Sequence, residues 1–244
     1  MSRTSKELTT DNYQILEWDS KIFGYEVAKI TRQDLSRSEL QEVLDNLRLQ
    51  QIKLAYWAQE EESTIAKECS GKMVDKKVTY MRQLDEVYSI EKNNNIKSWL
   101  HKPLEDRILS LALQSGKYSR FKVDKNFTRN EYYKLYSAWI KGSLEGSIAK
   151  EVLVYQFDLN NIVGLLTINF DREESVIGLL SVDAKYRHLG VGRQLMLEAF
   201  NLSKTNAAQE IFVSTQSRNK IACKFYEKMG FVSNKVIYIY HFWL

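Results

Sequence analysis

The chain of 244 residues contains little cysteine, histidine or proline. Its two cysteines, Cys69 and Cys223, form no Cys-x-x-Cys pair and its three histidines are scattered, so we expect no metal site. No segment reaches the ~18 apolar residues that a membrane span needs, and the polar first residues are followed by no apolar core. These absences predict a protein of the reducing cytoplasm with no membrane partner.

A strong charge of either sign is also missing. The 35 Lys and Arg residues stand against 31 Asp and Glu residues, which gives a formal net charge of +4. We therefore expect no nucleic-acid partner, although a local basic cluster can still bind a phosphorylated ligand. Hydrophobic residues make up 44% of the chain, and the length allows one large core or two modest ones.

The first ninety residues alternate between strand and helix patterns, with residues 18–24 as a turn around aromatic side chains. The expected elements are strands at 13–16 and 25–30, a helix from Ser36 or Ser38 to Gln51, a strand at 52–57, a helix at 64–69 and a strand at 72–84. We expect residues 1–90 to form a smaller N-terminal α/β subdomain, followed by a polar linker at 91–102.

Residues 103–244 predict the main domain. Pro103, the only proline, fits the first turn of a helix, and the segment 118–127 has no clear period and is expected to be a loop. Further expected elements are a helix at 130–143, strands at 151–158, 162–170 and 175–182, a helix at 191–202, a strand at 210–215, a helix at 219–228 and a strand at 236–244. The three adjacent strands predict an antiparallel meander. The last strand either completes its own sheet or pairs with a second subunit in a homodimer.

A turn with the pattern Arg187-x-x-Gly190-x-Gly192 joins an expected strand to an expected helix. The pattern matches neither a P-loop nor a dinucleotide-binding fingerprint. Glycines let the backbone approach a ligand, and the first amides of a helix attract an anion. Because Arg187 and Arg193 add positive charge, the turn favours a pyrophosphate. An ordinary strand-to-helix turn with solvated basic residues is the alternative.

Asn219 and Tyr226 lie seven positions apart on the next expected helix. Two helical turns place them about 10 Å apart along one stripe, within reach of an extended pantetheine-like arm. The Asn219 carboxamide can bond amide groups of such an arm, and the Tyr226 hydroxyl, with a usual pKa of about 10, can donate to a thiolate. A helix N-cap and a half-buried aromatic side chain are the alternative interpretations.

Three successive features resemble the GNAT family of acetyl-CoA-dependent N-acetyltransferases over residues 150–244. They are the strand ending Gly178-Leu179-Leu180-Ser181-Val182, the glycine turn, and Asn219 leading to Phe225-Tyr226-Glu227-Lys228-Met229-Gly230-Phe231. One departure is Ala184, where such enzymes often carry proline.

The resemblance implies a mixed, mostly antiparallel central sheet flanked by helices, with the N-terminal half as a degenerate GNAT-like companion. It implies Tyr226 as the general acid and acetyl-CoA as cosubstrate. The cofactor-binding residues that it implies are Leu180, Ser181, Val182, Arg187, His188, Leu189, Gly190, Val191, Gly192, Arg193 and Asn219.

Further stretches resemble one branch of the family, the TDP-fucosamine acetyltransferases, which acetylate nucleotide-linked amino sugars. They are residues 18–24, residues 119–121 with Phe127 and Trp139-Ile140, and residues 215–219. The resemblance implies a TDP-linked amino sugar as acceptor, with Ser119, Arg120 and Phe121 in its binding site. An arginine can pair with a diphosphate while an aromatic ring covers a sugar or base. A surface loop with a solvated arginine is the alternative.

We expect direct attack of a neutral amine on the thioester, with a backbone N–H near Leu180 to Val182 stabilising the oxyanion. The position of Asp75 resembles that of an acidic residue in the sugar enzymes. We expect its carboxylate to act as the base through a water. A surface aspartate paired with neighbouring lysines is the alternative. Two other functions stay open: a GNAT enzyme acting on a protein N-terminus, lysine or polyamine, and a non-catalytic coenzyme-A-binding regulatory module.

Overall fold

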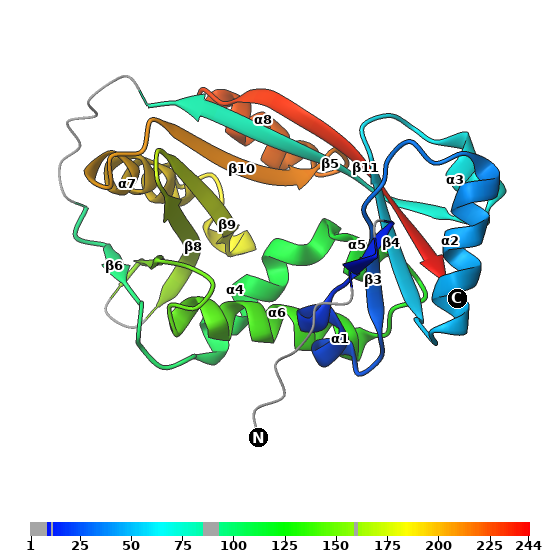
Figure 1. The fold of residues 1–244 in the computed structure, drawn as a ribbon. Coiled ribbons are helices and arrows are strands. Elements are labelled where there is room, and N and C mark those ends of the chain that lie inside the picture. Colours follow the sequence, from blue (N-terminus) through cyan, green and yellow to red (C-terminus); the bar gives the residue numbers. More distant parts are fainter. Residues whose placement is uncertain (1–8, 11, 85–92, 159–160) are drawn as a thin grey trace. The chain divides into compact units, whose positions relative to one another are not determined.

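The computed structural model describes residues 9–10, 12–84, 93–158 and 161–244 (Figure 1). Its contacts divide the chain into two units, residues 1–77 with 236–244 and residues 78–235. Strands β5 (Lys72–Gln83) and β11 (Val232–Trp243) each run from one unit into the other. The division therefore falls on two long strands and not on the polar stretch at 91–102. Residues 91 and 92 of that expected linker lie outside the described residues, and Ile96–Ser98 form strand β6.

The first unit contains a sheet with three helices. Its strand order is β1 (Thr9–Thr10), β2 (Tyr13–Ile15), β3 (Val27–Ile30), β4 (Leu54–Gln59) and β11. Strand β3 is parallel to β4, and the other pairs are antiparallel. The helices are α1 (Glu17–Phe23), α2 (Arg37–Leu49) and α3 (Thr64–Glu68). Because β11 pairs with β4, the last strand completes the sheet of its own chain, one of the two expected arrangements.

Two N-terminal predictions have opposite outcomes. Ser36 caps α2 as expected and forms a capping box with Glu39, in which each side chain bonds the backbone N–H of the other residue. The expected turn at 18–24 is wrong because residues 17–23 form α1. The N-cap residue Leu16 has no side chain that can cap the helix, so the sequence carries no start signal for it. Gly24, in the left-handed region with φ +80°, ends the helix.

The second unit is built on a sheet in the order β5, β10 (Glu210–Gln216), β9 (Glu174–Val182), β8 (Ile162–Asp171), β7 (Glu151–Gln156) and β6. Strands β7, β8 and β9 form the expected antiparallel meander, and β10 is parallel to β9. The main helices are α4 (Asp106–Ser115), α6 (Arg129–Leu144), α7 (Val191–Thr205) and α8 (Lys220–Lys228).

Helices cover both faces of the meander. A Cβ added to Gly164 of β8 would lie 2.8 Å from Leu195 of α7, so α7 packs directly against that face. A Cβ added to Gly178 of β9 would lie 3.8 Å from Trp139 of α6, which covers the opposite face together with α4. Both faces bury apolar side chains, which holds the strand ends in fixed positions.

Two expectations in the second unit need correction. The expected loop at 118–127 contains the helix α5 (Arg120–Val123), which is only one turn long and therefore shows no period in the sequence. Pro103 precedes α4 and does not lie in its first turn, because the helix begins after Glu105. Among the helices of the described residues, none has the length and apolar character needed to cross a membrane.

Candidate functional site

The parallel strands β9 and β10 pair over only part of their length. Their register runs from Glu174↔Glu210 to Ile177↔Val213, while β9 continues to Val182. Just past the last pair, the register of β9 with β8 shifts, and Thr167 Oγ1 accepts a hydrogen bond from the Leu179 N–H at 2.8 Å. Such an irregularity bends and twists a strand. The end of β9 thus keeps its pairing with β8 without pairing with β10.

The backbone of this strand end has a defined orientation. The Asp183 N–H donates to the Val163 carbonyl at 2.9 Å, so alternation turns the backbone groups of Ser181 toward β8 and those of Leu180 and Val182 toward the β10 side. The Val182 carbonyl already accepts hydrogen bonds from Gln114 Nε2 at 2.7 Å and from Arg187 Nε at 3.1 Å. The N–H groups of Leu180 and Val182 are therefore what β9 offers to a ligand.

The turn before α7 is held by Asp183. Its Oδ1 accepts a hydrogen bond from the Lys185 N–H at 2.8 Å, and its Oδ2 lies 2.5 Å from Arg107 Nη2. The hydrogen bond from the Lys185 backbone and the Arg107 guanidinium hold the pKa of Asp183 below its usual value. The carboxylate therefore stays charged near neutral pH and fixes the entry to the glycine turn.

The N-terminus of α7 is open to a ligand. Gly190 is its N-cap residue, in the left-handed region with φ +81°, and no side chain caps the helix. The N–H groups of Val191, Gly192 and Arg193 in the first turn lack intrahelical acceptors and carry the positive end of the helix dipole. The backbone of this turn can therefore bind an anion.

Helix α8 supplies the other wall. Asn219 caps it, with Oδ1 accepting from the Ala222 N–H at 3.3 Å and Nδ2 donating to Thr215 Oγ1 at 3.3 Å. The N-cap interpretation of Asn219 thus holds, and the residue also lines the cavity described below.

Tyr226 is 5% exposed, with its ring packed against those of Tyr80, Phe225 and Phe231. Its burial raises the pKa of the phenol above the usual value, and a smaller contribution comes from Cys223. Within the described residues its hydroxyl makes no hydrogen bond. A neutral phenol is therefore available to donate a proton.

A cavity of about 680 Å³ joins these elements. Ten of the eleven residues expected to bind the cofactor line it, and Leu189, which is 59% exposed, does not. Tyr226 lines the same cavity. The basic residues in its wall are Lys117, Arg187, Arg193, Lys224 and Lys228, together with His188, and within the described part of the chain no aspartate or glutamate joins them. The cavity suits an extended, strongly anionic ligand.

The residues expected to bind the acceptor lie beside this cavity wall and not in it. Tyr118 lines the cavity, whereas Ser119, Arg120 and Phe121 follow it in sequence and do not. The Ser119 hydroxyl is buried, the Arg120 guanidinium lies 4.3 Å over the Phe121 ring, and that ring packs edge-on against Phe127. An arginine stacked on a buried ring differs from the solvated loop residue of the alternative interpretation.

Asp75, the expected base, lies on the part of β5 that belongs to the first unit. It is 3% exposed, so the alternative of a surface aspartate is wrong. Its role as base stays a prediction.

No sequence pattern pointed to Gln114. This residue of α4 lines the cavity and bonds both Ser181 Oγ and the Val182 carbonyl. A single glutamine on a helix has no distinctive spacing, and its role depends on a strand more than sixty residues away. Tyr80 was likewise not singled out, although its ring lies 5.7 Å from that of Tyr226 and its hydroxyl donates to Glu227.

Of the His, Cys, Asp and Glu side chains in the described part of the chain, only His188 lines the cavity. In the described ranges, the side chains of His, Cys, Asp and Glu nowhere gather in threes as a metal site requires.

Comparisons with known proteins agree with this geometry. Residues 117–231 match the family model described as acetyltransferase (GNAT) family. The chain is 23% identical over 138 residues to the spore coat polysaccharide biosynthesis protein SpsD of Bacillus subtilis, covering 57% of this chain and 47% of that protein. It is 32% identical over 84 residues to N-alpha-acetyltransferase 30 of Xenopus laevis, covering 32% of this chain and 31% of that protein. The chain thus spans less than half the length of either relative.

The fold is also found among solved structures. A GCN5-related N-acetyltransferase from Sphaerobacter thermophilus has a TM-score of 0.57 to this chain at 14% sequence identity, covering 94% of this chain and 75% of that one. The mixed sheet flanked by helices is the GNAT fold, as the sequence predicts.

Proposed function

We propose that this chain, which has the GNAT fold and whose residues 117–231 match the model of the GNAT family of acetyltransferases, transfers an acetyl group from acetyl-CoA to a primary amine. The observation that carries the proposal is one cavity lined by both the open N-terminus of α7 and the neutral phenol of Tyr226. The first can bind the pyrophosphate of coenzyme A, and the second can protonate the thiolate that leaves when an amine attacks the thioester.

The residues of the cavity fit coenzyme A. The N–H groups of Val191 to Arg193, with the guanidinium groups of Arg187 and Arg193, would hold the pyrophosphate. One of the N–H groups of Leu180 and Val182 would bond an amide carbonyl of the pantetheine arm, as a neighbouring strand would, which leaves the other for the reacting end of the ligand. Bound acetyl-CoA supplies an acetyl thioester, which is activated toward attack by an amine.

The chain's own groups would then stabilise the charges that develop. A backbone N–H of the Leu180 to Val182 segment would donate to the developing oxyanion, and Tyr226 would protonate the departing sulfur. Burial keeps the phenol neutral, which preserves its proton for that step. Asp75 is proposed as the base that accepts the proton of the amine through a water.

A nucleotide-linked amino sugar is the acceptor that we propose. The similarity to SpsD, which is named for polysaccharide biosynthesis, supports it. Arg120 stacked on Phe121 supports it as well, because this pair combines a diphosphate-binding cation with an apolar ring next to the cavity wall at Tyr118. A TDP-linked sugar follows from the resemblance of the sequence to TDP-fucosamine acetyltransferases.

The amino terminus of a protein is the second candidate acceptor. The observation that favours it is the 32% identity to N-alpha-acetyltransferase 30 over 84 residues. That identity exceeds the one to SpsD but covers a shorter segment. A lysine or polyamine acceptor belongs to the same alternative, whereas the neutral Tyr226 in the cavity disfavours a non-catalytic module.

Mass spectrometry of acetyl transfer distinguishes the acceptors. The protein is incubated with acetyl-CoA and a panel of TDP- and UDP-linked amino sugars, peptides with free N-termini and polyamines. We expect one acetyl group on a nucleotide sugar and none on the other amines. Transfer only to a peptide or polyamine would support the acetyltransferase activity and contradict the nucleotide sugar as acceptor. Binding of acetyl-CoA without transfer to any amine would contradict the acetyltransferase activity itself.

A further inference from the structure

The positive charge around the cavity exceeds what a pyrophosphate requires. Five Lys and Arg side chains line the cavity, and within the described residues no carboxylate does. The open turn of α7 with Arg187 and Arg193 already matches the two charges of a pyrophosphate. Lys224 and Lys228, both exposed, remain on α8. This surplus indicates a further anionic group on the ligand.

The cavity face of α8 has two distinct edges. At about 100° per residue, Lys224 lies about 160° around the helix from Tyr226, and Lys228 lies only about 40° from Lys224. Phe225 lies between the two edges and contacts the start of α7, because a Cβ added to Gly192 would be 3.6 Å from its ring. The order across the cavity is therefore Tyr226, then the pyrophosphate turn, then the two lysines.

The edge formed by Lys224 and Lys228, here called the lysine edge, also carries an exposed apolar side chain. In the described part of the chain neither Lys224 nor Lys228 forms an ion pair, and the neighbouring Glu227 accepts a hydrogen bond from Tyr80. Ile221, which is 66% exposed, lines the cavity on the same edge as the lysines. An exposed isoleucine beside two cations suits a planar base next to a phosphate.

Resting on the proposed function, we infer that Lys224 and Lys228 bind the 3′-phosphate of coenzyme A while Ile221 packs against its adenine. The order of groups in coenzyme A is the order of the cavity: sulfur, pantetheine, pyrophosphate and then the phosphorylated adenosine. A phosphate monoester carries close to two negative charges at neutral pH, which two lysines neutralise. The protein therefore distinguishes coenzyme A from 3′-dephospho-coenzyme A.

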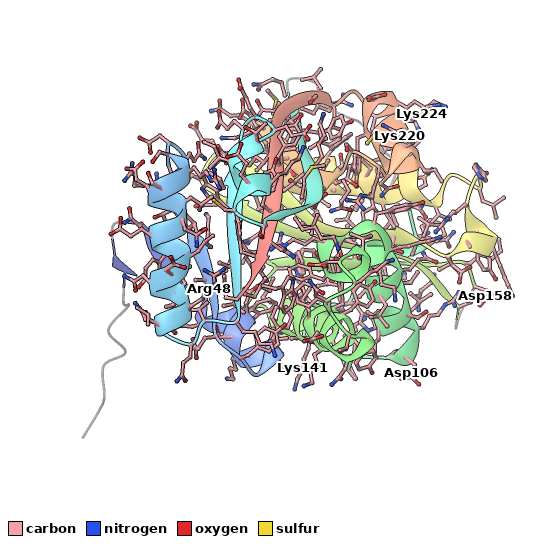
Figure 2. All side chains as sticks on the ribbon, turned by 90° about the vertical axis from the view of Figure 1, so that its right-hand side faces the viewer. Arg48, Asp106, Lys141, Asp158, Lys220 and Lys224 are labelled. Atoms are coloured by element: carbon pink, nitrogen blue, oxygen red, sulfur yellow. The ribbon has the colours of Figure 1, made fainter. Side chains whose placement is uncertain are left out.

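Calorimetric titration with coenzyme A and with 3′-dephospho-coenzyme A tests the inference. We expect the wild-type protein to bind coenzyme A about tenfold more tightly, and the Lys224→Ala/Lys228→Ala variant to lose that preference. Lys220→Ala is the control, because Lys220 lies on the same helix as Lys224 (Figure 2) and its substitution also removes a positive charge, but it does not line the cavity. Its preference should equal that of the wild type. Ile221→Ala should weaken the binding of both ligands and keep the preference for coenzyme A.

The outcomes separate this inference from the proposed function. Equal binding of the two nucleotides by the wild-type protein, or a preference that survives in the double variant, would overturn the inference and leave the acetyltransferase proposal intact. Failure of the wild-type protein to bind either nucleotide would overturn both. Thermal melting of each variant verifies that the exposed substitutions leave the fold intact.

Discussion

Gln114 uses one nitrogen, Nε2, to donate hydrogen bonds to both Ser181 Oγ and the Val182 carbonyl, each at 2.7 Å. The residue comes from α4, which covers one face of the meander, and its two acceptors lie at the end of β9. With the carbonyl of Val182 occupied, the adjacent N–H groups remain for a ligand. Gln114 therefore fixes the strand end that we assign to the pantetheine arm.

Gln114→Ala should raise the KM for acetyl-CoA several-fold with a smaller change in kcat, because binding and not proton transfer depends on this strand end. Loss of two hydrogen bonds should also lower the free energy of unfolding by about 1–2 kcal/mol. Gln114→Glu should act in the same direction, since a carboxylate cannot donate to a carbonyl. Steady-state kinetics and urea unfolding measure both effects; an unchanged KM in both variants would refute the role of Gln114.

Tyr226→Phe should lower kcat about a hundredfold while the affinity for acetyl-CoA stays the same, because general acid catalysis contributes about that much or more. Tyr80→Phe is the matched control, since its hydroxyl bonds Glu227 and does not line the cavity. It should lose far less activity. Full turnover by Tyr226→Phe with unchanged coenzyme binding would eliminate Tyr226 as the acid.

The pH profile tests the same residue independently. Burial raises the folded-state pKa of Tyr226 above its unfolded value, so the neutral phenol stabilises the fold at every pH below the unfolded value of about 10. That contribution is lost only as the pH rises further. We therefore expect no loss of kcat from ionisation of Tyr226 between neutral pH and pH 10, and phenolate absorbance of this residue only above it.

Two glycines of the coenzyme turn should respond differently to alanine. Gly190→Ala places a side chain at φ +81° and should cost about 1 kcal/mol of stability. Gly192→Ala places a methyl group 3.6 Å from Phe225 and Val182, an ordinary contact, and should retain stability. Because Gly192 lines the cavity, its variant should still raise the KM for acetyl-CoA. Thermal unfolding of both variants checks the contrast, which equal stabilities would contradict.

The capping box of α2 predicts a pH effect in the first unit. Hydrogen bonds with Ser36, aided by Arg32, lower the pKa of Glu39 to about 2. Because the folded-state pKa is depressed, this interaction stabilises the fold above the usual pKa of 4.5 and is lost as the pH falls to about 2. In an NMR titration, Ser36→Ala should raise the pH midpoint at which the Glu39 carboxylate titrates. The control Ser63→Ala, which removes the cap of α3, should leave that midpoint unchanged. An unmoved midpoint in Ser36→Ala would contradict the assignment.

Sequence patterns predicted the elements that repeat over several turns or residues. The α2 helix with its Ser36 cap, the meander and the turn before α7 are examples, because each carries a period or a glycine signature. The helices α1 and α5 were missed because they are short and no side chain caps their first turn, whereas the equally short α3, which was predicted, follows the cap residue Ser63.

The site was predictable only where a local motif encodes it. The glycine turn and the stripe of Asn219 and Tyr226 are local motifs, and the resemblance to the GNAT family implied that they serve one ligand; both line the same cavity. Gln114 and the lysine edge of α8 depend on how distant helices meet the sheet, which spacing does not encode. The boundary between the units was not predicted either, because it crosses two regular strands, which carry no polar linker signal in the sequence.

The structure of the complex with coenzyme A tests the central claim most directly. Our account predicts the pyrophosphate at the N–H groups of Val191, Gly192 and Arg193, with the sulfur within hydrogen-bonding distance of the Tyr226 hydroxyl. A pyrophosphate bound elsewhere, or a sulfur remote from Tyr226, would contradict it.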